Sequence, residues 1–210
     1  MAGKELDRVK VLACTGGIGS GKTYVCRIFE KMGIPVYYSD DRAKALYADP
    51  EVKARIVALF GADVYTSEGR LDGKRLASIV FNDPEALKSL ESVIHPAVKE
   101  DFLQWKQEVS ANRTPDLQSG VFPVILESAI LLERPMFLEL ADYVLTVTAP
   151  EDLRIRRVIS RDGVTEEMVR SRISCQMEEK SRIERSDFVI FADDRRALLP
   201  QMHAVLEKIR

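Results

Sequence analysis

The chain of 210 residues lacks several features that would assign it to a broad class of protein. Its three cysteines are odd in number and widely spaced, which argues against a disulfide framework and for a reducing compartment. Only two histidines are present, so a metal cluster built from His and Cys ligands is not expected. The N-terminal residues lack the apolar core of a signal peptide, and no apolar run approaches the roughly 18 residues of a membrane span. We therefore expect a cytoplasmic protein.

Charge of one sign is also missing, because acidic and basic residues nearly cancel to a net charge of −2. This balance gives no general attraction to nucleic acid or to an anionic membrane, and neither is expected as a partner. With 46% hydrophobic and 30% charged residues, the composition is that of a soluble globular protein. The length suits one compact domain or a core with insertions. The sequence does not indicate the oligomeric state.

Glycine accounts for only 11 residues, but four of them fall within residues 16–23, which have the sequence GGIGSGKT. This octapeptide matches the phosphate-loop pattern G-x-x-x-x-G-K-S/T in full. A short β-leaning segment, 9–14, precedes it. An apolar stripe at helical spacing follows it, formed by Val25, Ile28, Phe29 and Met32. Strand, glycine loop and helix are the context that the motif requires, and a glycine-rich turn that binds nothing is the weak alternative.

The chemistry of the loop follows from its residue types. Glycines let several main-chain N–H groups converge on one anion, and the helix that follows adds the positive end of its dipole. Lys22 places a cation on the β- and γ-phosphates, and the Thr23 hydroxyl can bind Mg²⁺. We therefore expect a nucleoside triphosphate and Mg²⁺ as ligands. The residues expected to hold them are Gly17, Ile18, Gly19, Ser20, Gly21, Lys22, Thr23 and Tyr24.

Five β-leaning segments separated by helical patterns predict an α/β fold with a five-stranded parallel sheet and helices on both faces. The segments are 9–14, 34–38, 121–126, 143–147 and 188–191. A phosphate-binding core would then comprise residues 1–40 and 121–210. The largely helical stretch 41–120, which ends in a solvated loop over 110–120, is a candidate acceptor-binding insertion. Residues 150–186 predict two helices separated by a turn, which suits a mobile lid.

The start of each helix in the segment 150–186 can also be predicted. Thr148 and Glu151 have the spacing of a capping box, with Pro150 in the first turn, and Thr165 begins the second helix. In the first helix Arg154, Arg157 and Arg161 share one face, and a guanidinium matches the charge that develops in phosphoryl transfer. The alternative is an exposed face paired with neighbouring carboxylates. Those carboxylates are Glu151, Asp152 and Asp162.

Asp40 follows the second predicted strand, at the edge of a parallel sheet where ligands gather. It could accept a proton from a substrate hydroxyl or orient that hydroxyl for attack. The alternative is a helix N-cap at Ser39, Asp40 or Asp41, and position alone leaves the two interpretations evenly balanced.

Three further residues leave alternatives open. His95 precedes Pro96 within a helical pattern, which favours a junction between two helices over a role near substrate. Glu127 and Glu133 flank the exit of the third strand, where either could hold a water on Mg²⁺, bind a substrate group or cap the following helix.

Taken together, these motifs resemble the dephospho-coenzyme A kinase family over most of the chain, from Val11 to about Ile190. The matching segments are TGGIGSGKT at 15–23, a strand ending in Asp40, SVIHP at 92–96, LLE at 131–133, RVISRDG at 157–163, Gln176 and Asp187. The sequence departs from the family pattern at Tyr38, Gly73, Ala129 and Arg154, and it lacks the usual asparagine after the last strand. With Tyr38 in place of the first aspartate of D-A-D, only Asp40 inherits the carboxylate role.

The resemblance implies a phosphate-loop kinase that transfers the γ-phosphoryl group of ATP to the ribose 3′-hydroxyl of dephospho-coenzyme A, a small-molecule acceptor. Lys22, Asp40 and Arg157 would then be catalytic. Arg154 and Arg161 would help to bind ATP, and His95 and the insertion 41–120 would hold the acceptor. Another kinase of the same class, acting on a small molecule or a nucleoside monophosphate, is the alternative. A nucleotide switch is disfavoured, since the N-K-x-D guanine-reading motif is absent.

Overall fold

The computed structural model describes residues 9–81, 83–112 and 121–209. The chain divides into two compact units, one made of Met1–Tyr38 and Gln107–Arg210 and the other of Ser39–Lys106. No helix in the described part of the chain is both long and apolar enough to cross a membrane.

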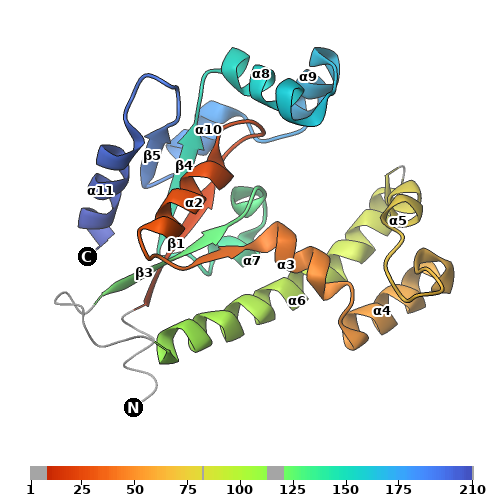
Figure 1. Ribbon diagram of the computed structural model, residues 1–210. Coiled ribbons are helices and arrows are strands. Elements are labelled where there is room, and N and C mark those ends of the chain that lie inside the picture. The colour runs from red at the N-terminus through yellow and green to blue at the C-terminus, as the bar shows by residue number, and fades with distance from the viewer. Residues whose placement is uncertain (1–8, 82, 113–120, 210) are drawn as a thin grey trace. The chain divides into compact units, whose positions relative to one another are not determined.

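The first unit is built on a parallel sheet of five strands (Figure 1). The strands are β1 (Val9–Thr15), β2 (Val36–Tyr38), β3 (Phe122–Glu127), β4 (Tyr143–Thr148) and β5 (Phe188–Phe191). Their order across the sheet is β2-β3-β1-β4-β5, so β1 is the central strand. The predicted five-stranded parallel sheet is confirmed, with strand ends that differ from the prediction by a residue or two. The predicted phosphate loop therefore leaves the carboxyl end of the central strand.

Helices and short turns connect these strands. In chain order they are α2 (Lys22–Lys31), η2 (Leu131–Glu133), α7 (Pro135–Leu138), α8 (Glu151–Asp162), α9 (Glu166–Ser174), α10 (Glu179–Glu184) and α11 (Leu198–Ile209). Apolar residues of α2 and α11 pack on the same face of the sheet, against Leu12 and Cys14 of β1. Val11 and Ala13, which point to the opposite face, are equally buried. Both faces of the sheet are therefore covered, as predicted for this fold.

The second unit is helical. It contains α3 (Ser39–Leu46), α4 (Pro50–Phe60), η1 (Ala62–Val64), α5 (Gly73–Val80) and most of α6 (Pro84–Ala111). Asp49 and Asp72 cap α4 and α5, since each carboxylate accepts two main-chain N–H groups of the first turn. The helix α6 runs unbroken through Pro96, so the predicted junction between two helices is wrong. Most of the loop predicted over 110–120 lies outside the described residues.

The predicted helix starts have mixed outcomes. Thr165 caps α9 by accepting the Met168 N–H, as expected. The capping box predicted for α8 is wrong, because Thr148 is still the last residue of β4 and Pro150 occupies the N-cap position. The helix α3 begins at Ser39, so Asp40 lies within its first turn and is not an N-cap.

Candidate active site

The phosphate loop joins β1 to α2 and has the backbone of an anion-binding turn. Gly19 and Gly21 have φ values of 76° and 93°, in the left-handed region where a side chain is strained. The Ser20 N–H donates to the Gly17 carbonyl at 3.0 Å and closes the turn. The first N–H groups of a helix have no acceptor within the helix, so those of Lys22 and Thr23 are available to an anion.

Behind the loop, Lys22 and Thr23 meet at Glu127. The Lys22 Nζ lies 2.7 Å from Glu127 Oε1, and the Thr23 hydroxyl donates to the same oxygen at 3.1 Å. Glu127 is the last residue of β3, which pairs with β1, and its side chain is only 5% exposed. The strand order therefore brings a carboxylate from a distant part of the chain to the cation and hydroxyl of the loop.

The pair of Thr23 and Glu127 fits a magnesium ion. Mg²⁺ prefers oxygen ligands and is held in many phosphoryl-transfer sites by one or two protein groups together with substrate phosphates and water. A hydroxyl at the start of α2 and a carboxylate at the end of β3, 3.1 Å apart, supply that kind of partial ligand set. No cluster of three or more His, Cys, Asp or Glu side chains capable of holding a metal occurs among the described residues.

The two cysteines near the loop are not reactive groups. Cys14 of β1 and Cys26 of α2 are fully buried. A hydrogen bond to Cys14, together with burial, raises the pKa of the Cys26 thiol well above its usual value, so this thiol stays protonated at neutral pH. Their role is packing in the core of the first unit.

Beside the loop lies a cavity of about 590 Å³, a volume typical of small-molecule sites. It is lined by Gly21, Tyr24, Arg157, Ala192, Asp194, Arg195, Arg196, Ala197 and Leu198. Arg157 of α8 spans its wall, because one terminal nitrogen donates to the Ala192 carbonyl at 2.9 Å and to Asp194 at 2.7 Å. The other terminal nitrogen reaches the Ser20 carbonyl at 3.5 Å. The cavity thus continues from the loop to the segment that follows β5.

The three arginines predicted to share a face of α8 lie in three different environments. Arg154 is 4% exposed and bound to Ile18 and Glu179, which leaves it within the protein rather than at the surface. Arg157 is half-buried at the cavity wall. Arg161 is exposed and pairs with Asp162, whose hydrogen bond raises the pKa of the guanidinium. Pairing with a neighbouring carboxylate, the alternative weighed for this face, is thus seen at Arg161.

The second unit contains the remaining predicted site residues. Asp40 is exposed in the first turn of α3, directly after β2. His95 is half-buried within α6. Gly73, a departure from the family pattern, is the first residue of α5.

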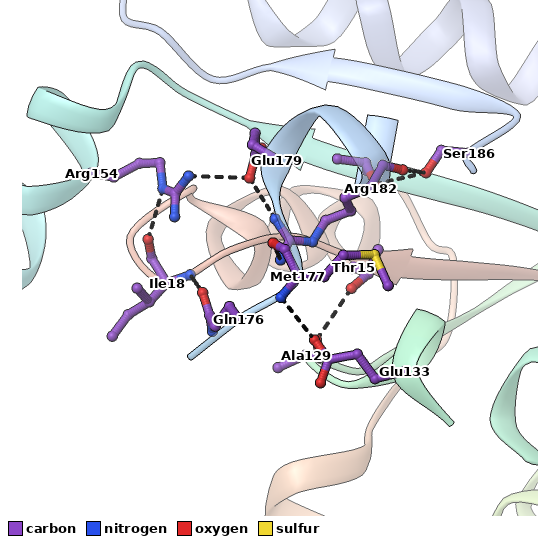
Figure 2. A network of polar contacts seen from close by, with 11 residues as sticks. Thr15, Ile18, Ala129, Glu133, Arg154, Gln176, Met177, Glu179, Arg182 and Ser186 are labelled. Carbon is purple, nitrogen blue, oxygen red and sulfur yellow. Dashed lines mark hydrogen bonds and ion pairs between the residues drawn. The ribbon is translucent and has the colours of Figure 1, made fainter. Parts of the chain in front are cut away.

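Sequence reasoning assigned no role to a polar network that surrounds the tip of the loop (Figure 2). Its members from residues 176–182 are Gln176, Met177, Glu179 and Arg182. Gln176 was noted only as a match to a family pattern. The spacing of Glu179 and Arg182 indicates no more than an ordinary helical ion pair. Glu133 joins the network by accepting the Met177 N–H at 3.3 Å.

A phosphate loop after the central strand, with a lysine, a hydroxyl and a carboxylate at its base, defines the class of phosphate-loop nucleotide-binding proteins, to which many kinases belong. The solved structure of shikimate kinase from Acinetobacter baumannii has the same fold, with a TM-score of 0.50 at 15% identity over 98% of this chain and 96% of that one. Within this class the chain belongs to the dephospho-CoA kinase family, whose model matches residues 10–197.

Individual relatives agree with this assignment. Over 91% of this chain and 88% of the relative, the chain is 37% identical to a protein of Bacteroides fragilis strain YCH46 named dephospho-CoA kinase. A Porphyromonas gingivalis protein of the same name is 38% identical over 95% of this chain and 94% of its own length. A crystal structure from Thermus thermophilus superposes with a TM-score of 0.79 at 32% identity, covering 97% of this chain and 99% of that one.

Proposed function

We propose that the chain transfers the γ-phosphoryl group of ATP to the ribose 3′-hydroxyl of dephospho-coenzyme A, which yields coenzyme A and ADP. This is the last step in the synthesis of that cofactor. The observation that carries the proposal is the convergence of Lys22 and Thr23 on Glu127 at the base of the loop, in a chain of this family.

The loop binds the triphosphate. The main-chain N–H groups from Gly17 to Thr23 surround the β- and γ-phosphates. The Lys22 ammonium group contacts these phosphates, either in place of Glu127 or in addition to it, and stabilises the negative charge that develops in the transition state. Thr23 and Glu127 hold Mg²⁺, directly or through water. The ion, when bound, neutralises charge on the triphosphate.

The nucleoside end of ATP lies in the cavity beside the loop. Tyr24, which is 63% exposed, and Arg196 both line this cavity. Arg157 donates to the Ser20 carbonyl and lines the same cavity, so a change of side-chain conformation brings its planar fork onto the phosphates. Arg161, exposed on the same helix, contributes through its charge, with Asp162 as its present partner.

Residues of the second unit bind the acceptor. Asp40 activates or orients the 3′-hydroxyl. Its exposed carboxylate directly follows the carboxyl end of β2, which pairs with β3, and ligands of parallel sheets bind at the carboxyl ends of the strands. His95, with the rest of the helical segment 41–120, contacts the acceptor. Residues 150–186 form the lid, whose closure excludes water as a competing acceptor.

An ADP-release assay tests this function directly. With ATP and Mg²⁺ we expect turnover on dephospho-coenzyme A and not on nucleoside monophosphates or sugar acids, and product analysis should place the phosphate on the ribose 3′-oxygen. Turnover on one of the other acceptors alone would select a different kinase of the same class. Asp40→Asn should lower kcat more than it raises the KM for the acceptor, whereas an effect on KM alone would make Asp40 a binding residue.

The setting of this activity is proposed to be the cytoplasm, with small molecules rather than nucleic acid or membrane as partners. The net charge of −2 and the absence of a membrane-spanning helix from the described residues support this setting.

A further inference from the structure

The tip of the phosphate loop is held from both sides by side chains outside the loop. The Ile18 N–H donates to Gln176 Oε1 at 2.9 Å, and the Ile18 carbonyl accepts the Nε–H of Arg154 at 3.0 Å (Figure 2). The Ile18 side chain packs against the apolar cluster that α8 and α9 form between them. Both main-chain groups and the side chain of one loop residue are thus fixed by residues of the segment 150–186.

The glycines on either side of Ile18 are in close contact with Arg154, and Gly17 also lies near Arg182. A methyl group added at Gly17 would lie 2.6 Å from a terminal nitrogen of Arg154 and 3.2 Å from one of Arg182. At Gly19 it would overlap the main-chain oxygen of Arg154. Arg154, in the first turn of α8, therefore contacts the loop at Gly17 through its side chain and at Gly19 through its backbone.

A shared carboxylate orients the arginines. Arg154 and Arg182 are 4% and 3% exposed, and both donate to Glu179 Oε2. Arg182 is further fixed by donating to the Met177 carbonyl at 2.8 Å. Because both arginines donate to the same carboxylate oxygen, the orientation of Arg154 depends on Glu179.

We propose that Arg154, Gln176 and Glu179 are positioning residues for phosphoryl transfer. Arg154 and Gln176 hold the two main-chain groups of Ile18, and Glu179 holds Arg154. Together they fix the direction in which the N–H groups from Gly19 to Thr23 point. Electrostatic stabilisation of a transition state depends on donors fixed before the reaction, so a loop released at its tip loses rate even though it keeps every phosphate-binding group.

A double-mutant cycle tests this inference, which rests on the proposed function. Gln176→Met removes the acceptor of the Ile18 N–H, and Arg154→Gln removes the fork that joins Ile18 to Glu179. Each should lower kcat by about tenfold to a hundredfold, the range for a small displacement of catalytic groups. Because both act through Ile18, the double variant should be scarcely worse than the more damaging single one. If the two factors instead multiplied, the two side chains would act independently and the proposal would be refuted.

The matched control is Arg170→Gln, the same substitution on the neighbouring helix α9. Arg170 is exposed and pairs with Glu166 and Glu151, and it is not one of the side chains that hold Ile18. It should leave kcat unchanged. If Arg154→Gln does not fold, Gln176→Met and its own control, Gln201→Met on α11, decide the question, since both replace a partly exposed side chain.

A second readout separates positioning from general damage and from failure of the proposed activity. Without acceptor, ATP–Mg²⁺ binding and the amide resonances of Gly19 and Gly21 report on the loop alone. We expect these resonances to shift in Gln176→Met at an unchanged Tm. Arg154→Gln should shift them too, with a lower Tm because it removes one member of a buried ion pair, and Arg170→Gln should leave them in place. Loop resonances like those of the wild type, or a kcat loss that only follows a loss of Tm, would overturn the inference. A wild-type chain that binds ATP but does not phosphorylate dephospho-coenzyme A would overturn the proposed function alone.

Discussion

Replacing Glu127 with glutamine should destabilise the protein in the absence of nucleotide. Two unit charges 2.7 Å apart attract by about 6 kcal/mol at an effective dielectric constant of about 20, and the cost of desolvating both ions opposes much of this. The side chains of Lys22 and Glu127 are 10% and 5% exposed, so water cannot solvate the lysine when its partner is removed. Removing one member of a buried pair costs about 3–5 kcal/mol.

Glutamine keeps an oxygen near the Thr23 hydroxyl and Lys22, so we expect the lower end of that range, about 3 kcal/mol. In a chain of this size, 1 kcal/mol corresponds to about 2–4 °C in Tm, and the expected fall is therefore about 6–12 °C. Thermal unfolding followed by circular dichroism or calorimetry measures it. The control is Glu207→Gln on α11, an exposed carboxylate whose substitution should change stability by less than about 0.5 kcal/mol.

A second substitution tests whether the loss comes from the ion pair. Lys22→Met removes the cation that Glu127→Gln leaves unpaired. The double variant should be more stable than the sum of the two single losses predicts, by about 1 kcal/mol or more. Strict additivity, or a Tm for Glu127→Gln within 2 °C of the Glu207→Gln control, would refute the reasoning from burial and charge.

Three other substitutions or treatments have definite expected outcomes. Gly19→Ala should weaken ATP binding at least tenfold, because an L-residue at φ 76° is strained by about 1–2 kcal/mol and the new methyl group meets Arg154. Calorimetric titration with ATP–Mg²⁺ measures the affinity, and an unchanged affinity would contradict the observed backbone. Arg157→Lys should lower kcat/KM by about tenfold or more, since the lysine ammonium group cannot replace the two parallel N–H donors of a planar guanidinium. Steady-state kinetics equal to those of the wild type would mean that Arg157 has only a structural role. Iodoacetamide at pH 8 should modify Cys175 and spare Cys26, whose pKa is raised, so mass spectrometry of the folded protein should find one adduct rather than two or three.

The sequence predicts the phosphate loop and the parallel sheet well, because both depend on local patterns. Glycine spacing, the Lys-Thr pair and short apolar runs are properties of neighbouring residues, so they can be interpreted without knowing which distant segments come into contact. The role of Glu127 could be named only as one of several alternatives. Its contact with Lys22 and Thr23 joins residues about a hundred positions apart and depends on β3 pairing with β1, which no local pattern specifies.

Helical periodicity is similarly limited. It places Arg154, Arg157 and Arg161 on one face of α8, but it does not reveal how deeply each position is buried. The first turn of α8 contacts the loop while its last turn is exposed, so three residues with the same pattern meet three environments. At Pro96 a local rule failed outright, since α6 accommodates the proline within a continuous helix.

In the proposed function, two distant stretches of sequence share the recognition of the nucleotide. Residues 16–23 would bind the phosphates, which all nucleoside triphosphates share. Residues 192–198, together with Tyr24 and Arg157, line the space proposed for the base and sugar, where such molecules differ. Preference for one phosphate donor over another can therefore evolve in the segment after β5 without any change to the loop, and exchanging that segment between relatives is a route to a kinase with an altered donor.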